Sequence, residues 1–178
     1  MAACIVRLAY ADPPYPGQAR KHYRHQPVCA EVNHGLLIAH LETFDGWALS
    51  TNPGALADLL PMCGPGVRVG AWVKPFCAFK KAPPGSATAC ISPAYSWEPV
   101  IFRSARVHTV PCRDHLVENI YMEPGFPGAK PPAFSRWIFD LLGAVEGDDF
   151  ADLFPGSGAV SAAWAARFDR SPQLELVA

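Results

Sequence analysis

The sequence predicts a single α/β domain, and three patterns support this prediction. An apolar run from Cys4 to Tyr10 has the composition of a buried strand, and the two prolines after it cannot donate to a sheet ladder. Residues 149–158 indicate a second short strand that enters a glycine turn, followed by a helix at 159–167. Residues 131–142 are typical of an amphipathic helix, opened by prolines and closed by Gly143.

The composition is that of one globular protein domain. The chain has 178 residues, of which 50% are hydrophobic and 17% are charged, so it can bury its own core and is not intrinsically disordered. No apolar run approaches the roughly 20 residues of a membrane span, and no signal peptide is apparent. The six cysteines contain no Cys-x-x-Cys pair, which indicates free thiols and no zinc site. We therefore expect a cytoplasmic protein without a metal.

The remaining elements follow from local periodicity. We expect a helix at 28–44, with Val28, Val32, Leu36, Ala39 and Phe44 on one apolar stripe and Leu37 and Leu41 beside it. Short strands are expected at 46–50, 67–73 and 97–102, a short helix at 55–62 and a long loop at 76–96. Residues 104–130 carry little periodicity and several prolines and glycines, so they predict an irregular insert.

The first predicted strand leads into Asp12-Pro13-Pro14-Tyr15. Ligands of open α/β sheets bind at the carboxyl ends of the strands. Asp-Pro-Pro-Tyr resembles motif IV of the amino-methyltransferases, which implies a carboxylate that accepts a hydrogen bond from the exocyclic amine of a base and so makes its nitrogen a better nucleophile. The prolyl carbonyl can accept the second N–H, and the aromatic ring can stack on a base that has left its helix. The alternative is an ordinary Pro-Pro turn beside a buried tyrosine.

A second motif, Asp152-Leu-Phe-Pro-Gly-Ser-Gly158, ends the second predicted strand. Glycines allow a backbone to approach a ligand closely, and the start of the following helix offers free N–H groups. A glycine turn of this kind is also common in proteins that bind nothing there.

Together these motifs resemble the amino-methyltransferases that use S-adenosyl-L-methionine. Asp12 to Tyr15 resembles their catalytic motif IV, and Asp152 to Gly158 resembles their cofactor motif I. Lys130-Pro131 matches the Lys-Pro that precedes motif I in the permuted branch, which places the catalytic motif first, and Trp72-Val73-Lys74 and Trp97-Glu98 resemble its intermediate strands. The chain is thus similar to a permuted, beta-type DNA amino-methyltransferase of the N6-adenine type.

The resemblance covers nearly the whole chain and implies a fold. This is the Rossmann-like methyltransferase fold, a mixed sheet with helices on both faces and a circularly permuted motif order. Because the chain stops at Ala178, we expect it to be truncated at the C-terminal end, without the outer strand beyond Glu175. One domain spans 1–178, with 104–130 as a small candidate target-recognition insert.

The resemblance also implies a role for each matching position. The implied catalytic residues are Asp12, Pro13, Pro14 and Tyr15. The implied contacts of the S-adenosyl-L-methionine cofactor are Asp12, Lys130, Pro131, Asp152, Phe154, Gly156, Ser157, Gly158 and Glu175. Glu175 would hold the ribose hydroxyls, and the alternative for it is an exposed strand or tail residue.

The charge distribution fits a nucleic-acid partner although the net charge is only −1, and the alternative is the ordinary fluctuation of charge along a chain. Residues 59–113 hold seven Lys or Arg and one acid, whereas 114–178 hold four Lys or Arg and ten acids. A basic loop at 20–25 could contact phosphates, with a solvated loop as the alternative. The candidate nucleic-acid contacts are Arg20, Lys21, Arg24, Lys74, Lys80 and Lys81.

The expected reaction is direct methyl transfer to N6 of adenine in DNA, either duplex with a flipped base or single-stranded. A homodimer or a partner chain could complete the site. Cytosine N4 or RNA could be the acceptor instead, or the chain could be a non-catalytic partner that binds nucleic acid. Pro111-Cys112 and Glu118-Asn119 also suggest a cysteine-dependent cytosine methyltransferase, but these motifs precede the glycine motif instead of following it.

Overall fold

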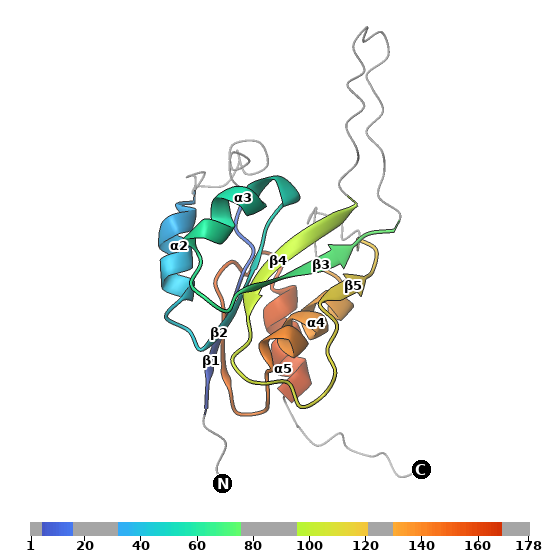
Figure 1. Ribbon diagram of the computed structural model, residues 1–178. Coiled ribbons are helices and arrows are strands. Elements are labelled where there is room, and N and C mark those ends of the chain that lie inside the picture. The colour runs from blue at the N-terminus through green and yellow to red at the C-terminus, as the bar shows by residue number, and fades with distance from the viewer. Residues whose placement is uncertain (1–4, 16–31, 76–95, 121–129, 169–178) are drawn as a thin grey trace, which may run out of the picture.

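The fold is an open six-stranded sheet with helices on both faces (Figure 1). The computed structural model describes residues 5–15, 32–75, 96–120 and 130–168. The strands are β1 (Arg7–Ala11), β2 (Gly46–Ser50), β3 (Arg68–Val73), β4 (Trp97–Arg103), β5 (His115–Val117) and β6 (Asp149–Asp152). The helices are α2 (His34–Leu41), α3 (Leu56–Leu59), α4 (Pro132–Leu142) and α5 (Ala159–Phe168), and 3-10 turns flank α3 at Pro53–Ala55 and Leu60–Met62.

The strand directions bring most strand ends to one edge of the sheet. The strand order is β5-β3-β4-β2-β1-β6. β1 runs parallel to β2 and β6, and β3 runs parallel to β5, whereas β4 is antiparallel to both β2 and β3. The carboxyl ends of five described strands and the amino end of β4 therefore lie at the same edge, which we name the carboxyl edge.

Two apolar clusters hold the layers together. On one face, α4 and α5 pack against the sheet, and the rings of Tyr10 and Trp72 contact that of Phe134. On the other face, α2 and α3 cover the sheet (Figure 1), and Trp47 packs in that cluster. Figure 1 shows these helix pairs on opposite sides of the strands. The mixed α/β sheet with helices on both faces, predicted from the sequence, is confirmed.

The central strands are buried on both faces, as the apolar runs predict. Residues 8–11 of β1 are at most 1% exposed, and every residue of β2 is buried. A strand covered by helices on both sides has no polar face, so its sequence is continuously apolar. The first strand begins later than predicted, at Arg7, and Ile5 before it is 65% exposed.

The two best predicted helices are confirmed. α4 begins with Pro132 at its first turn and buries Trp137 and Leu141. It ends at Gly143, whose φ of 71° is the left-handed conformation that glycine adopts without strain. α5 follows the glycine turn, and its Trp164 stacks on Phe150 of β6 at 4.6 Å between ring centroids.

The predicted apolar stripe of the helix at 28–44 is wrong at Leu36 and Ala39, whereas Phe44 does pack against the core and Val28 lies outside the described residues. Asn33 caps the described helix α2 by accepting from the Leu36 N–H, and the buried positions are His34, Ile38 and Leu41. Leu36 is 70% exposed and Ala39 is also exposed. Because most positions from 35 to 39 are apolar, periodicity could not choose the buried face, and contact with the sheet decides it.

The segment 104–130 is not wholly irregular, contrary to the prediction. Its residues His115–Val117 form β5 at the edge of the sheet, paired in parallel with Ala71–Val73. The strand has only three residues, which is too short for an alternating pattern to appear. Among the described helices, none combines the length and hydrophobicity needed to cross a lipid bilayer.

Candidate functional site

The two motifs meet at the carboxyl edge, where their strands are neighbours. β1 pairs with β6 so that Tyr10 lies opposite Asp152, and the Leu153 N–H donates to the Tyr10 carbonyl at 2.9 Å. Asp12 therefore leaves one strand directly beside the start of the glycine turn. Stretches about 140 residues apart in the sequence are brought to a common site by one strand pairing.

The proline turn after β1 fixes Asp12 beside a buried cation. Pro13 is buried, and neither proline can continue the ladder of β1. The Asp12 Oδ2 atom lies 3.1 Å from the Lys130 Nζ atom, which also lies 3.5 Å from the Glu98 Oε2 atom. The side chains of Asp12 and Lys130 are 27% and 9% exposed. The ammonium is thus shared by two carboxylates in a largely dehydrated position.

Burial alone would lower the pKa of Lys130. The carboxylates of Asp12 and then Glu98 outweigh it and hold this pKa above the ordinary lysine value. Lys130 therefore stays protonated at neutral pH and remains the counterion of both carboxylates.

Glu98 connects Lys130 with two further groups. The strand β4 enters the sheet at the carboxyl edge, so the Glu98 carboxylate reaches the ammonium of Lys74, which follows β3. The Tyr15 hydroxyl also donates a hydrogen bond to Glu98. Burial would raise the pKa of Glu98, but Lys130, Lys74 and this hydroxyl keep it below the ordinary value. The carboxylate is therefore ionised and holds three donors.

Asp152 ends β6 with one carboxylate oxygen unpaired. Its Oδ2 atom accepts from the Ser161 hydroxyl at 2.9 Å, whereas Oδ1 is buried and has no hydrogen-bond partner among the described residues. Burial raises the pKa of Asp152, and hydrogen bonds from the Ser161 hydroxyl and from the Phe154 and Ser161 N–H groups oppose this, whereas the Asp12 carboxylate raises the pKa further. Since a buried carboxylate oxygen without a donor is costly, the site is suited to a ligand that brings one.

The turn after Asp152 requires its glycines. Gly156 and Gly158 have φ values of 50° and 78°, a region that residues with a Cβ rarely adopt. A Cβ on Gly158 would meet no atom within 4 Å, so this side of the turn is open. The Gly158 N–H donates to the Pro155 carbonyl at 2.6 Å, and the Gly158 carbonyl accepts from the Ala162 N–H in α5. The turn therefore presents bare backbone beside Asp152.

The predicted site residues fall into three groups. Asp12, Lys130 and Asp152 are brought together at the carboxyl edge, and Pro13, Pro14, Tyr15, Pro131, Phe154, Gly156, Ser157 and Gly158 belong to the same turns. Arg20, Lys21, Arg24, Lys80, Lys81 and Glu175 lie outside the described residues. Lys74 needs a correction, because its side chain is 9% exposed and paired with Glu98, which does not favour contact with a DNA phosphate.

Sequence reasoning did not assign a site role to Glu98. A signal was present, since Glu98 is the single acid among the seven basic residues of 59–113. A single carboxylate in a segment rich in Lys and Arg is a candidate for an ion pair with more than one of these residues.

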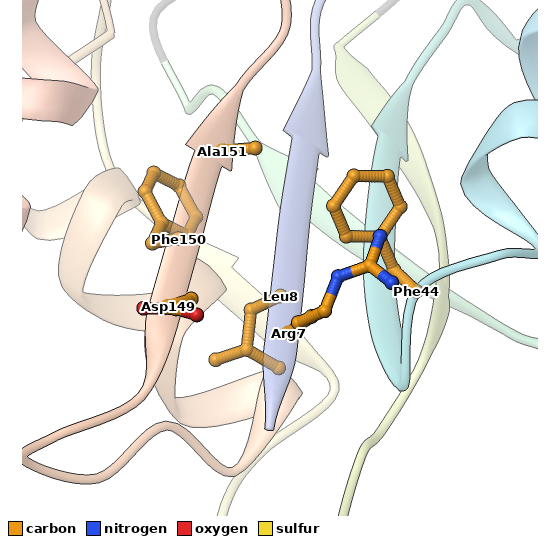
Figure 2. A pocket seen from close by; sticks show the side chains of 6 residues that line it. All are labelled: Arg7, Leu8, Phe44, Asp149, Phe150 and Ala151. Carbon is orange, nitrogen blue, oxygen red and sulfur yellow. The ribbon is translucent and has the colours of Figure 1, made fainter. Parts of the chain in front are cut away.

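A shallow pocket also lies over the first halves of β1 and β6 (Figure 2). Figure 2 shows the Arg7 side chain reaching to the Phe44 ring, and the guanidinium carbon lies 4.9 Å from the centre of that ring. Asp149, at the start of β6, lines the other side. Neither Asp12 nor Asp152 lines this pocket, so it is separate from the candidate site.

In comparisons of sequence, neither a family model nor a curated protein matches the chain. Comparison of structure finds similar solved proteins. The M1.HpyAVI–SAM complex has a TM-score of 0.53 and 15% identity, with 93% of this chain and 80% of that chain covered. The PvuII DNA methyltransferase, which is cytosine-N4-specific, has a TM-score of 0.59 and 14% identity, with 92% and 72% covered. The chain has the fold of these two proteins.

Proposed function

We propose that this protein is an S-adenosylmethionine-dependent DNA methyltransferase that methylates the N6 amine of adenine. The observation that carries the proposal is the pairing of β1 with β6, which places Asp12 beside the turn that begins at Asp152. Methyl transfer requires the carboxylate that binds the amine and the turn that holds the methyl donor to lie in one site. Asp12 and the turn after Asp152 are close enough to play these two parts. Both structural neighbours are SAM-binding or DNA-methylating proteins by name.

The residues at the carboxyl edge fit the cofactor. The unpaired, buried Oδ1 atom of Asp152 is a suitable acceptor for the ammonium of the methionine part. The open glycine turn from Gly156 to Gly158 allows the ligand to approach the backbone. When bound, S-adenosylmethionine supplies a methyl group on a positively charged sulfur. Asp12 is already paired with Lys130, so the negative charge at the carboxyl edge that favours a cationic ligand is mainly that of Asp152.

Asp12, Pro13 and Tyr15 would hold the base. Since Lys130 contacts the Oδ2 atom of Asp12, we assign Oδ1 to accept the hydrogen bond from the target amine. The Pro13 carbonyl accepts the other N–H, and the Tyr15 ring stacks on the base. These contacts raise the electron density on the amine nitrogen and fix its direction, so most of the acceleration comes from positioning and electrostatics.

The second candidate is transfer to N4 of cytosine. One structural neighbour is cytosine-N4-specific by name, and both bases offer an exocyclic amine to the same carboxylate. We favour adenine because, among the amino-methyltransferases that the sequence resembles, Asp at the position of Asp12 tends to accompany adenine and Ser to accompany cytosine. RNA in place of DNA, and a nucleic-acid-binding partner without catalysis, are outcomes that the test below separates from this proposal.

The structure gives no support to a cysteine-dependent mechanism. Cys112 precedes Asp114, which forms an ion pair with Arg68 at the start of β3, and so lies toward the end of the sheet opposite Asp12. Burial, and after it the Asp140 carboxylate, raises the pKa of the Cys112 thiol. A thiol with a raised pKa is a poor nucleophile.

The test is incubation of the protein with labelled S-adenosylmethionine and either mixed DNA or mixed RNA, followed by nucleoside analysis. We expect N6-methyladenine from DNA as the product. The variant D12A should lower kcat/KM by about 100-fold or more, since loss of one preorganised group costs about that much. It should still bind the cofactor by calorimetry, because Asp152 is unchanged. D114N, which alters an exposed carboxylate far from the site, is the matched control and should keep full activity.

Four results would count against the proposal. The absence of any methylated nucleoside together with absent cofactor binding would favour a non-catalytic partner. N4-methylcytosine as the product would correct the acceptor base, and label in RNA alone would correct the acceptor polymer. Undiminished turnover in D12A would remove Asp12 from the reaction.

A further inference from the structure

Glu98 occupies an unusual position in the sheet. Among the described strands, β4 alone runs against its neighbours. It therefore places the second residue of a strand, and not a residue after one, at the carboxyl edge beside Asp12 and Lys130. The Glu98 side chain is 22% exposed, so most of its carboxylate is removed from water.

This carboxylate contacts groups from three separate segments. It is paired with the ammonium of Lys74 after β3, it lies 3.5 Å from the Lys130 Nζ atom before α4, and it accepts from the Tyr15 hydroxyl after β1. The Trp72 ring lies against both ammonium groups, at 4.3 Å from Lys74 and 5.4 Å from Lys130. The backbone of Glu98 is thus held by the pairing of β4, and its carboxylate holds the three donors of Lys74, Lys130 and Tyr15 in place.

Two of these donors belong to the proposed reaction. Tyr15 carries the ring that stacks on the base, and Lys130 holds the Oδ2 atom of Asp12 at 3.1 Å. Because Lys130 is shared, the position of Glu98 sets where the ammonium lies, and the ammonium sets the orientation of Asp12. We propose that Glu98 is a positioning residue for the methyl transfer, which aligns the Tyr15 ring and the Asp12 carboxylate through its bonds to Tyr15 and Lys130. This inference rests on the proposed function.

The chain offers a matched control for the charge and burial of Glu98. Glu42 pairs with Arg103, and these two side chains are 25% and 24% exposed. Glu42 also accepts from the Gly64 N–H at 2.9 Å, so its loss should affect folding to a similar degree. These bonds of Glu42 involve neither Asp12 nor Tyr15 nor Lys130.

The kinetic test compares E98Q with E42Q. We expect E98Q to lower kcat by about 100-fold, the cost of a small misplacement of reacting groups, while the dissociation constant for S-adenosylmethionine changes much less. E42Q should keep kcat. In a double-mutant cycle, Y15F should lower kcat by about tenfold in the wild type but hardly at all in the E98Q background, because coupled residues are not additive. Normal turnover in E98Q, or additive effects of the two substitutions, would overturn the proposal.

A second measurement does not depend on activity. Nitration of Tyr15 by tetranitromethane, followed by peptide mass spectrometry, reports how easily its hydroxyl ionises and is reached. Since Glu98 accepts from this hydroxyl and is itself negatively charged, we expect Tyr15 to react several-fold faster in E98Q than in wild type or E42Q. An unchanged rate would refute the positioning contact. A faster rate in a protein that transfers no methyl group would refute the proposed function while retaining the contact.

Discussion

Replacement of Lys130 by methionine tests the ion cluster at the carboxyl edge. The Lys130 Nζ atom lies 3.1 Å from Asp12 and 3.5 Å from Glu98, and its side chain is 9% exposed. At an effective dielectric constant of about 20, each contact corresponds to about 5 kcal/mol of Coulomb attraction, and desolvation of the buried ammonium offsets several kcal/mol. Removing one member of such a pair leaves the partners uncompensated, so we expect K130M to lower the free energy of unfolding by about 3 kcal/mol.

The pH dependence gives this prediction a second check. The Glu98 carboxylate, whose pKa lies below the ordinary value, needs a counterion only while it is ionised, so part of the deficit of K130M should disappear as the pH falls through that lowered pKa. The folded-state pKa of Lys130 is raised. The titration of the ammonium itself therefore leaves this stabilisation intact below the ordinary lysine pKa and removes it only as the pH rises through the raised value. At neutral pH Lys130 is protonated, and the loss expected in acid comes from the carboxylate alone.

Urea unfolding of the wild type and K130M at neutral and at acidic pH measures both effects. R68M is the control, because the Arg68–Asp114 pair is 62% and 52% exposed and should contribute less than about 1 kcal/mol. A loss of about 3 kcal/mol corresponds to a fall in Tm of roughly 6–12 °C for a domain of this size. If K130M unfolds at the same urea concentration as wild type, the ion cluster does not stabilise the fold and the prediction is wrong.

Two further predictions concern the other buried carboxylates. D152N should weaken S-adenosylmethionine binding by about 10- to 100-fold, the value of a charge-assisted hydrogen bond. In the wild type, calorimetric affinity should fall as the pH is lowered through the raised pKa of Asp152, and D152N should remove this dependence; a pH-independent wild type would contradict the role. D148N should lower the free energy of unfolding by about 3 kcal/mol, because Asp148 is 1% exposed and accepts from Arg106, Val6 and Val145. Burial would raise the pKa of Asp148, but these donors hold it below the ordinary value. The stabilisation that Asp148 provides is therefore present above its pKa in the unfolded chain, and it is lost as the pH falls through its lower pKa in the folded protein. Urea unfolding of D148N against wild type should show a gap at neutral pH that narrows in acid, and an equal gap at every pH would contradict this assignment.

The sequence predicted the elements whose burial leaves a local signal. β2 lies at the predicted residues, because each side chain from Gly46 to Ser50 is buried. α4 and α5 were also predicted, since prolines and glycines mark where such helices begin and end. The sequence also allowed us to infer that the motif at Asp12 and the motif at Asp152 lie close together. Each follows a predicted strand, and the carboxyl ends of parallel strands lie at the same edge of a sheet.

Other features depend on contacts that no local pattern encodes. The buried face of α2 is chosen by the sheet against which Ile38 and Leu41 pack. β5 exists because β3 offers an unpaired edge, and its three residues carry no signal of their own. Lys74 was expected at a DNA surface, but its partner Glu98 is 24 residues away in the sequence, and only the antiparallel pairing of β3 with β4 brings the two together.

That antiparallel pairing also brings the end of β3 and the start of β4 to one point of the carboxyl edge. β3 leaves the sheet and β4 re-enters it at the carboxyl edge, with Val73 opposite Trp97. The Lys74 N–H donates to the Ser96 carbonyl at 2.7 Å, so the two ends are fastened just outside the strands. The chain consequently leaves and re-enters the sheet at the same place, and the register of β3 against β4 is held there by the strand pairing and by this hydrogen bond.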